Sequence, residues 1–198
     1  MFVQVIESKT SDAEGLKRMG DRWEAELRPG AVGYLGVTAG ATADGKAITI
    51  VRFESEELAR KNEARPEQGA FFEEMQKYVD GEPKFSESTD VQEFAGSGDK
   101  NSAKFVQVMK SSGIDRDRMK VLDDAFEQFT DQRPDLLGVF RVWTGPTSCI
   151  DVAYFTDEAA ARAGESKEIP AELEKLMSEF GDLMQNTEYL DLVDPTVR

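Results

Sequence analysis

The segment Phe2-Val3-Gln4-Val5 recurs letter for letter as Phe105-Val106-Gln107-Val108. Each copy is an apolar run with β-branched residues, which is typical of a short strand. Other matches follow in the same order along the chain: Arg28-Pro29 with Arg133-Pro134, Phe53 with Phe155, and Ala59-Arg60 with Ala161-Arg162. Matches in a constant order are the signature of an internal repeat, so the sequence indicates a duplicated unit of roughly 95 residues.

A small, polar stretch from Ala95 to Ser102 separates the two copies. It offers no large apolar side chain to a core, which is typical of a linker. The sequence therefore predicts a first repeat over residues 1–95, a linker over 96–103 and a second repeat over 104–198.

The first half of each repeat is predicted to be a strand, a helix and a hairpin. After a strand over 2–7, the helix starts at the Ser-x-x-Glu capping box Ser11–Glu14 and ends at Arg28-Pro29-Gly30. Strands over 31–39 and 47–53 are joined by the turn signal Asp44-Gly45.

The second half of each repeat is predicted to be two helices and a strand. Ser55 and Thr156 are the expected N-caps of the shorter helices, and a longer amphipathic helix follows each of them. A final strand is expected near 85–94 and again near 187–193.

The order β-α-β-β-α-β is that of the ferredoxin-like split unit. We therefore expect an α+β fold of two tandem ferredoxin-like units. Each unit covers one face of its sheet with helices, so the uncovered faces are expected to meet in an intrachain α+β barrel, an internal pseudo-dimer. Because one chain holds both halves, a monomer is the expected state.

Charge and composition exclude several classes of function. The chain has 39 acidic and 24 basic residues and no histidine, which gives a net charge of −15. This charge argues against binding to nucleic acid or to an anionic membrane. Without histidine, neither histidine acid–base chemistry nor a histidine-ligated haem nor an ordinary zinc site is available.

Cys149 is the only cysteine, so an internal disulfide and a CxxC metal or redox motif are both excluded. No apolar run is long enough to span a bilayer, and the N-terminus shows no signal-peptide pattern. A cytoplasmic protein without metal or cofactor is expected.

The chain resembles the dimeric α+β barrel superfamily, and within it the antibiotic-biosynthesis-monooxygenase-like proteins, here as a tandem single chain. The resemblance is carried by the Phe-Val-Gln-Val strand, by the turn Arg28-Pro29-Gly30 with Gly33, and by the segment Val51–Glu57. It implies cofactor-independent oxidation of a small aromatic or quinol-type compound. In such reactions the substrate itself reacts with dioxygen, and the protein supplies binding, deprotonation and charge stabilisation.

The chain departs from the family pattern at one point that matters for chemistry. Where family members often have a histidine, this chain has Asn62 and Gly164. The haem-degrading branch, which needs an axial histidine, is therefore excluded, and a base would have to be a carboxylate, a tyrosine or a bound water. No catalytic residue is assigned.

Candidate ligand-binding residues come from the second strand of each repeat, where side chains alternate between two faces. One row is apolar: Gly33, Leu35 and Val37, aligned with Gly138, Phe140 and Val142. It is expected to pack on the helices. The opposite row differs between the copies and includes Tyr34, Arg141 and Trp143. These three line a pocket if their row faces the barrel interior; otherwise they cover the rim of the sheet.

Gln4 and Gln107 lie mid-strand among apolar neighbours, where a buried amide needs hydrogen-bond partners. They are either a satisfied structural amide pair or polar anchors on a cavity wall. Arg52 and Tyr154 occupy matching positions at the end of the third strand, where they either contact a ligand or pair with nearby acidic residues.

Asp151 is the carboxylate placed within the third-strand run and hence the candidate base, although a solvated position at a sheet edge is the expected alternative. Cys149 has no histidine to activate it and is not expected to act as a nucleophile.

Three functions remain open: an oxygenase for a small aromatic compound, a non-catalytic protein that binds a small apolar ligand, and a protein-interaction module with a solid core. Because the two copies differ at the row of Tyr34 and Arg141, one dominant pocket is expected instead of two equal ones.

Overall fold

The structure, a computed structural model, describes residues 1–127, 132–167 and 171–198. The elements from the N-terminus to the linker are β1 (Phe2–Lys9), α1 (Ala13–Glu26), η1 (Arg28–Gly30), β2 (Tyr34–Ala41), β3 (Lys46–Phe53), α2 (Glu56–Glu63), α3 (Pro66–Met75), η2 (Gln76–Tyr78), β4 (Lys84–Ser88), β5 (Val91–Ala95) and η3 (Lys100–Ser102). They continue with β6 (Phe105–Ser112), α4 (Arg116–Phe126), β7 (Leu136–Trp143), β8 (Ser148–Phe155), α5 (Glu158–Glu165), α6 (Ala171–Leu183) and β9 (Thr187–Val197).

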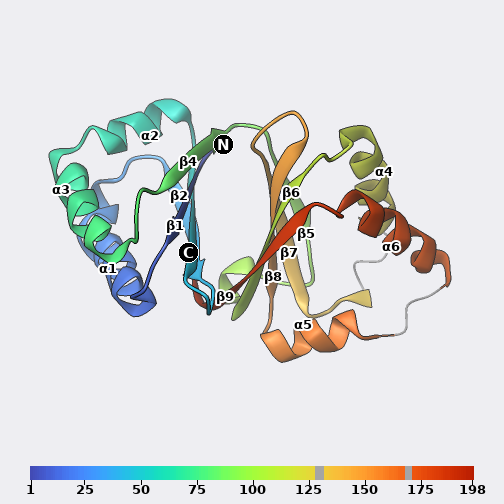
Figure 1. Ribbon diagram of the computed structural model, residues 1–198. Helices are drawn as coiled ribbons and strands as arrows, with labels where there is room; N and C mark the ends of the chain where they lie inside the picture. Colours follow the sequence, from blue (N-terminus) through green and yellow to red (C-terminus); the bar gives the residue numbers. More distant parts are fainter. Residues whose placement is uncertain (128–131, 168–170) are drawn as a thin grey trace. The chain divides into compact units, whose positions relative to one another are not determined.

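The chain forms two compact units. Unit 1 comprises Met1–Thr89 together with Leu192–Arg198, and unit 2 comprises Asp90–Asp191. In each unit the helices cover one face of an antiparallel sheet, with α1, α2 and α3 on the strands of unit 1 and α4, α5 and α6 on those of unit 2 (Figure 1). The expected α+β fold of two tandem ferredoxin-like units is confirmed.

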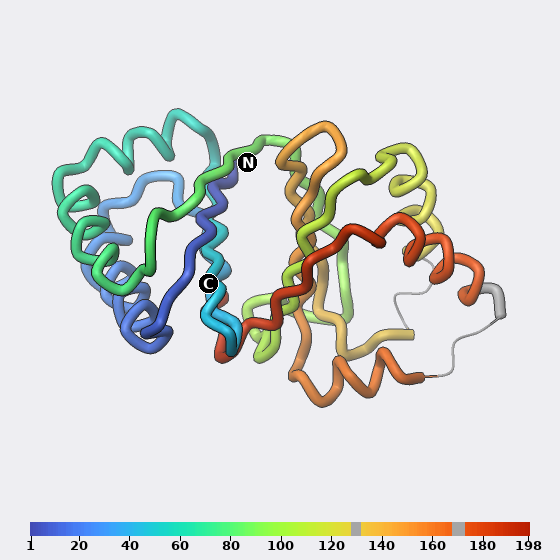
Figure 2. The backbone as a smooth tube through the Cα atoms, in the orientation of Figure 1, coloured from blue at the N-terminus to red at the C-terminus, as the bar shows by residue number. Residues whose placement is uncertain are grey.

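The strand order is β4-β1-β3-β2 in unit 1 and β6-β8-β7-β5 in unit 2. The first residues of β9 extend the sheet of unit 2 beside β6, and its last residues pair with β2 in unit 1. The path of the chain through each unit can be followed in Figure 2.

The final strand expected over 85–94 is in fact two strands that belong to different units. β4 pairs with β1, and β5 pairs with β7 of unit 2. A turn at Thr89-Asp90 separates them, and β9 makes the corresponding change of unit without a break. Each sheet is therefore completed at one end by residues from the closing segment of the other copy. The repeat boundaries themselves stay a prediction from sequence.

Two helix starts differ from the sequence prediction by one residue. The N-cap of α1 is Asp12, which accepts a hydrogen bond from the backbone N–H of Gly15. Ser11 donates to Asp80 instead of capping the helix. The N-cap of α5 is Asp157 and not Thr156, whereas Ser55 caps α2 as expected. A carboxylate and a hydroxyl cap equally well, so both patterns were compatible with the sequence.

No helix in the described part of the chain is long and apolar enough to cross a membrane.

Candidate functional site

The register of the strands shows which side chains face the helices. Phe2 pairs with Phe53, and Phe53 pairs with Tyr34. These residues pack with Ala59 of α2 in one buried cluster, so their row lies on the helix-covered face. The same holds in unit 2 for Phe105, Phe155 and Ala161 of α5.

The expected orientation of the second strand was wrong in unit 2 and only partly right in unit 1, where Val37 faces the helices as expected but Tyr34 does so too. Arg141 and Trp143 pair with Asp151 and Cys149 on the helix-covered face, and not on the face turned away from the helices. Phe140 and Val142, expected to pack on the helices, lie on the opposite face.

Each second strand has a β-bulge, at Gly36 and at Gly138. Both glycines have positive φ, +141° and +155°. In unit 1 the bulge reverses the alternation between Tyr34 and Thr38, so counting in twos placed these two residues on one face although they lie on opposite faces. The bulges also show that Gly138 corresponds to Gly36 and not to Gly33, so the alignment that gave the expected face of Phe140 was wrong.

Unit 2 holds a buried group of charged residues between its helices and its sheet. Arg141 donates from Nε to Oδ1 of Asp151 at 2.6 Å, and from Nη1 to Oδ2 of Asp123 on α4 at 2.5 Å. The side chains of Arg141 and Asp151 are 4% and 3% exposed. The alternative of a solvated Asp151 at a sheet edge is therefore wrong.

Burial governs the acidity of this group. It raises the pKa of Asp151, against the opposing effect of the Arg141 guanidinium, and it raises the pKa of Asp123 in the same way. Burial, together with the negative charge of Asp151, raises the pKa of the Cys149 thiol to about 12. A thiol with such a pKa is protonated at neutral pH, which agrees with the prediction that Cys149 is not a nucleophile.

Aromatic side chains enclose the same group. The guanidinium carbon of Arg141 lies 5.1 Å from the ring centroid of Phe94 and 5.9 Å from that of Trp143. Trp143 Nε1 donates to Gln92 Oε1 at 3.0 Å, so β5 covers the group from the end of the sheet. We call Asp123, Arg141, Trp143, Cys149 and Asp151 the unit 2 cluster.

The matching positions of unit 1 carry small side chains. Strand register matches Ala39 and Thr49 to Arg141 and Asp151, because both pairs lie opposite each other at the same distance from the bulge. Counting from the N-caps Asp12 and Asp115 matches Gly20 to Asp123. The remaining matches are Ala41 to Trp143 and Ala47 to Cys149.

This part of unit 1 is open. A Cβ atom added to Gly20 would find no heavy atom within 4 Å, apart from the backbone of its own helix. Ala39 and Thr49 keep part of their surface exposed although they face the helices, whereas Arg141 and Asp151 are buried.

The helices pack differently in the two units. Met19 and Leu27 of the first helical segment form a core cluster with Phe71 of α3. In unit 2 the corresponding cluster joins Met119 and Leu122 of α4 to the strand residues Trp143 and Cys149 and to Leu183 of α6. The helix α1 contacts β2 through Trp23, whose ring lies beside that of Tyr34.

One end of this open space is aromatic and polar. The ring centroids of Trp23 and Tyr34 lie 4.8 Å apart. Tyr34 OH donates to Oε1 of Glu24 at 2.6 Å, and Arg28 Nη1 lies 3.2 Å from Oε2 of the same carboxylate. Burial and this hydrogen bond raise the pKa of Tyr34, so the phenol stays protonated. We call the space bounded by Gly20, Ala39, Thr49, Trp23, Tyr34 and Glu24 the unit 1 hollow.

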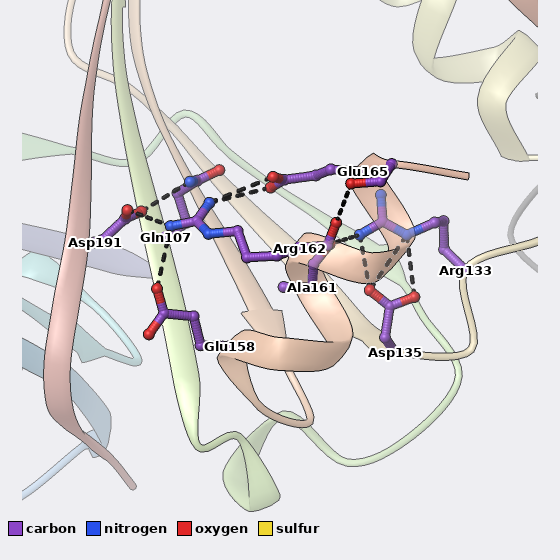
Figure 3. A network of polar contacts seen from close by, with 9 residues as sticks. Gln107, Arg133, Asp135, Glu158, Ala161, Arg162, Glu165 and Asp191 are labelled. Carbon is purple, nitrogen blue, oxygen red and sulfur yellow. Dashed lines mark hydrogen bonds and ion pairs between the residues drawn. The ribbon is translucent and has the colours of Figure 1, made fainter. Parts of the chain in front are cut away.

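Gln4 and Gln107 belong to two similar polar networks, one within each unit. In unit 2, Gln107 donates to Asp191 at 2.8 Å, and Arg162 binds Glu158, Glu165 and Asp191 (Figure 3). In the same figure Arg133 binds Asp135 and the carbonyl of Ala161.

Unit 1 repeats the first of these networks residue for residue. Gln4 donates to Glu87 at 2.8 Å and also to Glu63, while Arg60 binds Glu56, Glu63 and Glu87. Each amide is satisfied by carboxylates of its own unit. Because the network ties the second helix to the edge of the sheet in both units, its arrangement is that of a structural clamp.

Arg52 and Tyr154 lie on the face turned away from the helices, and thus away from the other candidates. Arg52 Nη2 donates to the backbone carbonyl of Arg198 at 2.7 Å. Tyr154 is fully buried, and Lys100 Nζ lies 5.9 Å from its ring centroid. The structure therefore brings Arg141 and Trp143 together in unit 2 and leaves Tyr34 alone of the candidates beside the unit 1 hollow.

Among the residues that the structure describes, no group of three or more cysteine, aspartate or glutamate side chains could hold a metal ion.

Comparison with known proteins finds similarity of fold and not of sequence. No protein-family model matches the chain, and no curated protein does. The chain is similar to the structure of a candidate monooxygenase from Fusobacterium nucleatum, with a TM-score of 0.74, 12% identity, and coverage of 99% of this chain and 91% of that one. It is similar to another candidate monooxygenase from Lactobacillus acidophilus, with a TM-score of 0.70, 11% identity, and coverage of 97% and 92%.

An anthrone oxidase-like protein matches over 99% of this chain and 92% of its own length, with a TM-score of 0.66 and 10% identity. Each of these solved chains is matched over 91–92% of its length. The expected resemblance to antibiotic-biosynthesis-monooxygenase-like proteins in tandem form is confirmed for the fold. The reaction is not transferred at identities of this size.

Proposed function

We propose that the chain binds a small aromatic compound in the unit 1 hollow and oxidises it with dioxygen, without a cofactor. The observation that carries the proposal is the open space beside Gly20, which matches Asp123 of unit 2, where that residue contacts Arg141, the match of Ala39. Ligand sites are typically concave, largely apolar and equipped with a few polar groups. The fold shared with candidate monooxygenases supports the choice of reaction.

The reaction needs no external reductant. A quinol or an anthrone-type compound carries two hydrogens that leave as water together with one oxygen atom of O₂. For an anthrone-type CH₂ group, the other oxygen atom becomes the new carbonyl. For a quinol, the other oxygen atom enters a ring C–H bond and gives a hydroxyquinone, so the atoms balance in both cases. The protein has to remove a proton to make the ring electron-rich and has to stabilise the resulting anion.

Glu24 is the residue we propose as the base. It lies four residues after Gly20 and therefore on the same face of α1. Its side chain is 12% exposed and is oriented by Tyr34 and Arg28. The hydrogen of the Tyr34 hydroxyl is donated to Glu24, so the Tyr34 oxygen would accept a hydrogen bond from a phenolic hydroxyl of the ligand, while Trp23 provides a flat apolar wall.

The test is dioxygen uptake with a panel of quinols and anthrone, measured with a Gly20→Leu variant. Leucine would fill the hollow, and we expect at least about a tenfold loss of kcat/KM, which corresponds to about 1.4 kcal/mol. Gly69→Leu is the matched control, because Gly69 is also a helical glycine with no atom near its Cβ but lies on the exposed side of α3. Equal activity of the two variants would contradict the location of the site.

Glu24→Gln separates binding from chemistry. Loss of a general base should lower kcat by about 10²–10⁴-fold with little change in ligand affinity. Glu127→Gln, at the matching position after α4, should leave both unchanged. If Glu24→Gln retained the full kcat, another group would be the base.

Binding without catalysis is the second candidate function. It is favoured by the absence of histidine, which leaves Glu24 and Tyr34 as the titratable groups at the aromatic end of the hollow. In that case anthrone or a quinol would bind stoichiometrically, Gly20→Leu would abolish binding, and no dioxygen would be consumed above the rate without protein.

We also propose that the working unit is a single chain, because both repeats are present in it. Light scattering should give a mass near 22.0 kDa.

A further inference from the structure

The unit 2 cluster occupies the same place in its repeat that is open in unit 1. Strand register and the helix N-caps establish the match independently of each other, as described above. Where unit 1 has two alanines and a glycine, unit 2 has Trp143, Arg141 and Asp123. The volume that is free in one repeat is therefore taken by side chains in the other.

We infer that the helix–sheet space of unit 2 is a second binding site for a small aromatic molecule, filled by the protein's own side chains, and that removing them opens it. The inference takes the class of ligand from the proposed function of unit 1. It goes beyond that function because it concerns the other repeat and predicts a site that the wild-type chain keeps closed.

The way Arg141 is held resembles the way a flat ligand would be held. Its guanidinium is planar and lies within about 6 Å of two ring centroids, those of Phe94 and Trp143. Its hydrogen-bonding edges are matched by Asp151 and Asp123. A planar group between aromatic rings, with polar partners at its rim, is the arrangement of a bound aromatic ligand.

The cover over the cluster is also made of side chains. Arg116 stacks on Trp143 with 3.9 Å between the guanidinium carbon and the ring centroid, and it forms an ion pair with Asp90. Gln92 accepts the hydrogen bond from the Trp143 indole. No buried side-chain nitrogen or oxygen lacks a partner in the described residues, so the closed state is complete.

Stability alone does not account for such a cluster. A buried ion pair contributes little to stability, because desolvation offsets most of the attraction between the charges. Unit 1 folds the same element order with Ala39 and Thr49 at these positions. The charged residues are therefore dispensable for the fold of a repeat, and their effect is to occupy the space.

The test is the triple variant Asp123→Gly/Arg141→Ala/Asp151→Thr, which gives these three positions of unit 2 the residues of unit 1 and keeps Trp143 and Cys149 as lining. Indole, a planar uncharged aromatic, is the probe, and its stoichiometry is measured by calorimetry. Apolar cavities lined in this way bind small aromatic molecules. We expect one more indole per chain than in the wild type. A folded triple variant with unchanged stoichiometry would overturn the inference.

Cys149 gives an independent readout, because it lies inside the cluster and is the only cysteine of the chain. Its reaction with a small thiol reagent should be at least about tenfold faster in the triple variant than in the wild type, as burial is relieved. An unchanged rate in a folded variant would count against an opened space.

The reciprocal variant Gly20→Asp/Ala39→Arg/Thr49→Asp decides the case if the triple variant does not fold. It builds the cluster into the unit 1 hollow and should fold, because the space is open, and it should lose the indole bound by the wild type. A reciprocal variant that fails to fold or still binds indole would overturn the equivalence of the two spaces.

Failure of the proposed function can be told apart from failure of this inference. If the wild type binds no indole and oxidises nothing, the unit 1 site is wrong. A gain of one indole in the triple variant would still support the site in unit 2.

Discussion

The two units of this chain have the same kinds of elements, structural clamps and bulges. They differ in the residues that lie between the helices and the sheet. Gln4 and Arg60 repeat the contacts of Gln107 and Arg162 on carboxylates of the second helix and the sheet edge. Thr49 and Asp151 stand at matching positions but have different surroundings. Thr49 is partly exposed, whereas Asp151 is buried with Arg141. Residues that hold the fold were kept in both copies, and residues that line the helix–sheet space were not.

The largest loss of stability is expected when Arg141, the cation of the unit 2 cluster, is removed. Arg141→Ala leaves Asp151 buried without its partner, and such a change typically costs about 3–5 kcal/mol. The free energy of unfolding, measured in urea, should fall by that amount. The control is Asp123→Asn/Arg141→Met/Asp151→Leu, which removes all three charges of the cluster and should lie much closer to the wild type. A small loss in the single variant would mean that water reaches Asp151.

The second prediction compares Gly15 and Gly20, two glycines of α1 with different surroundings. A Cβ atom on Gly15 would lie 2.3 Å from Asp12 and from Tyr78, so Gly15→Ala should lower the free energy of unfolding by about 1–3 kcal/mol. Gly20→Ala meets open space and should raise it by up to about 1 kcal/mol, because alanine favours a helix over glycine. Equal effects in urea unfolding would mean that the hollow is closed.

The sequence was sufficient for the fold and insufficient for the faces of the strands. Repeated motifs, caps and the Asp44-Gly45 hairpin are local signals, and they led to the correct element order except for the closing strand of the first repeat, which is split into β4 and β5. The bulges at Gly36 and Gly138 could not be located by counting, because each glycine is one of several in its strand region. Gly138 was therefore aligned with Gly33 instead of Gly36, and Arg141 and Trp143 were assigned to the wrong face.

The candidate site was predicted only in part, because some of its residues leave no visible pattern in the sequence. Tyr34 was found from its position in a variable row, but Glu24 and Gly20 were missed. Both lie in a helix whose apolar stripe gave the only visible pattern, and an absent side chain leaves no signal. A signal did exist in the comparison of repeats: Gly20 stands where the second copy has Asp123.

The two units should also differ in how their contribution to stability depends on pH. Burial raises the folded-state pKa of Asp151 above its unfolded value, so the folded state binds the proton more tightly. Stability contributed by this group is therefore present at low pH and is lost as the pH rises from the ordinary carboxyl range through the raised pKa. The difference in unfolding free energy, wild type minus Asp151→Asn, should fall over that interval. A Thr49→Val variant, at the matching position of unit 1, should show no such trend.

The smallest effects are expected from the clamps, and here the units should behave alike. Arg60 and Arg162 both stack on the opening phenylalanine of their repeat, with 5.4 Å and 5.2 Å from the guanidinium carbon to the ring centroid. Both bind three carboxylates at a largely exposed position, where salt screens the attraction. Arg60→Met and Arg162→Met should therefore lower the melting temperature slightly and by similar amounts, and the loss should shrink at high salt. A clearly larger loss in unit 2 would show that its clamp also supports the unit 2 cluster, and would mean that the two units have diverged beyond the helix–sheet space.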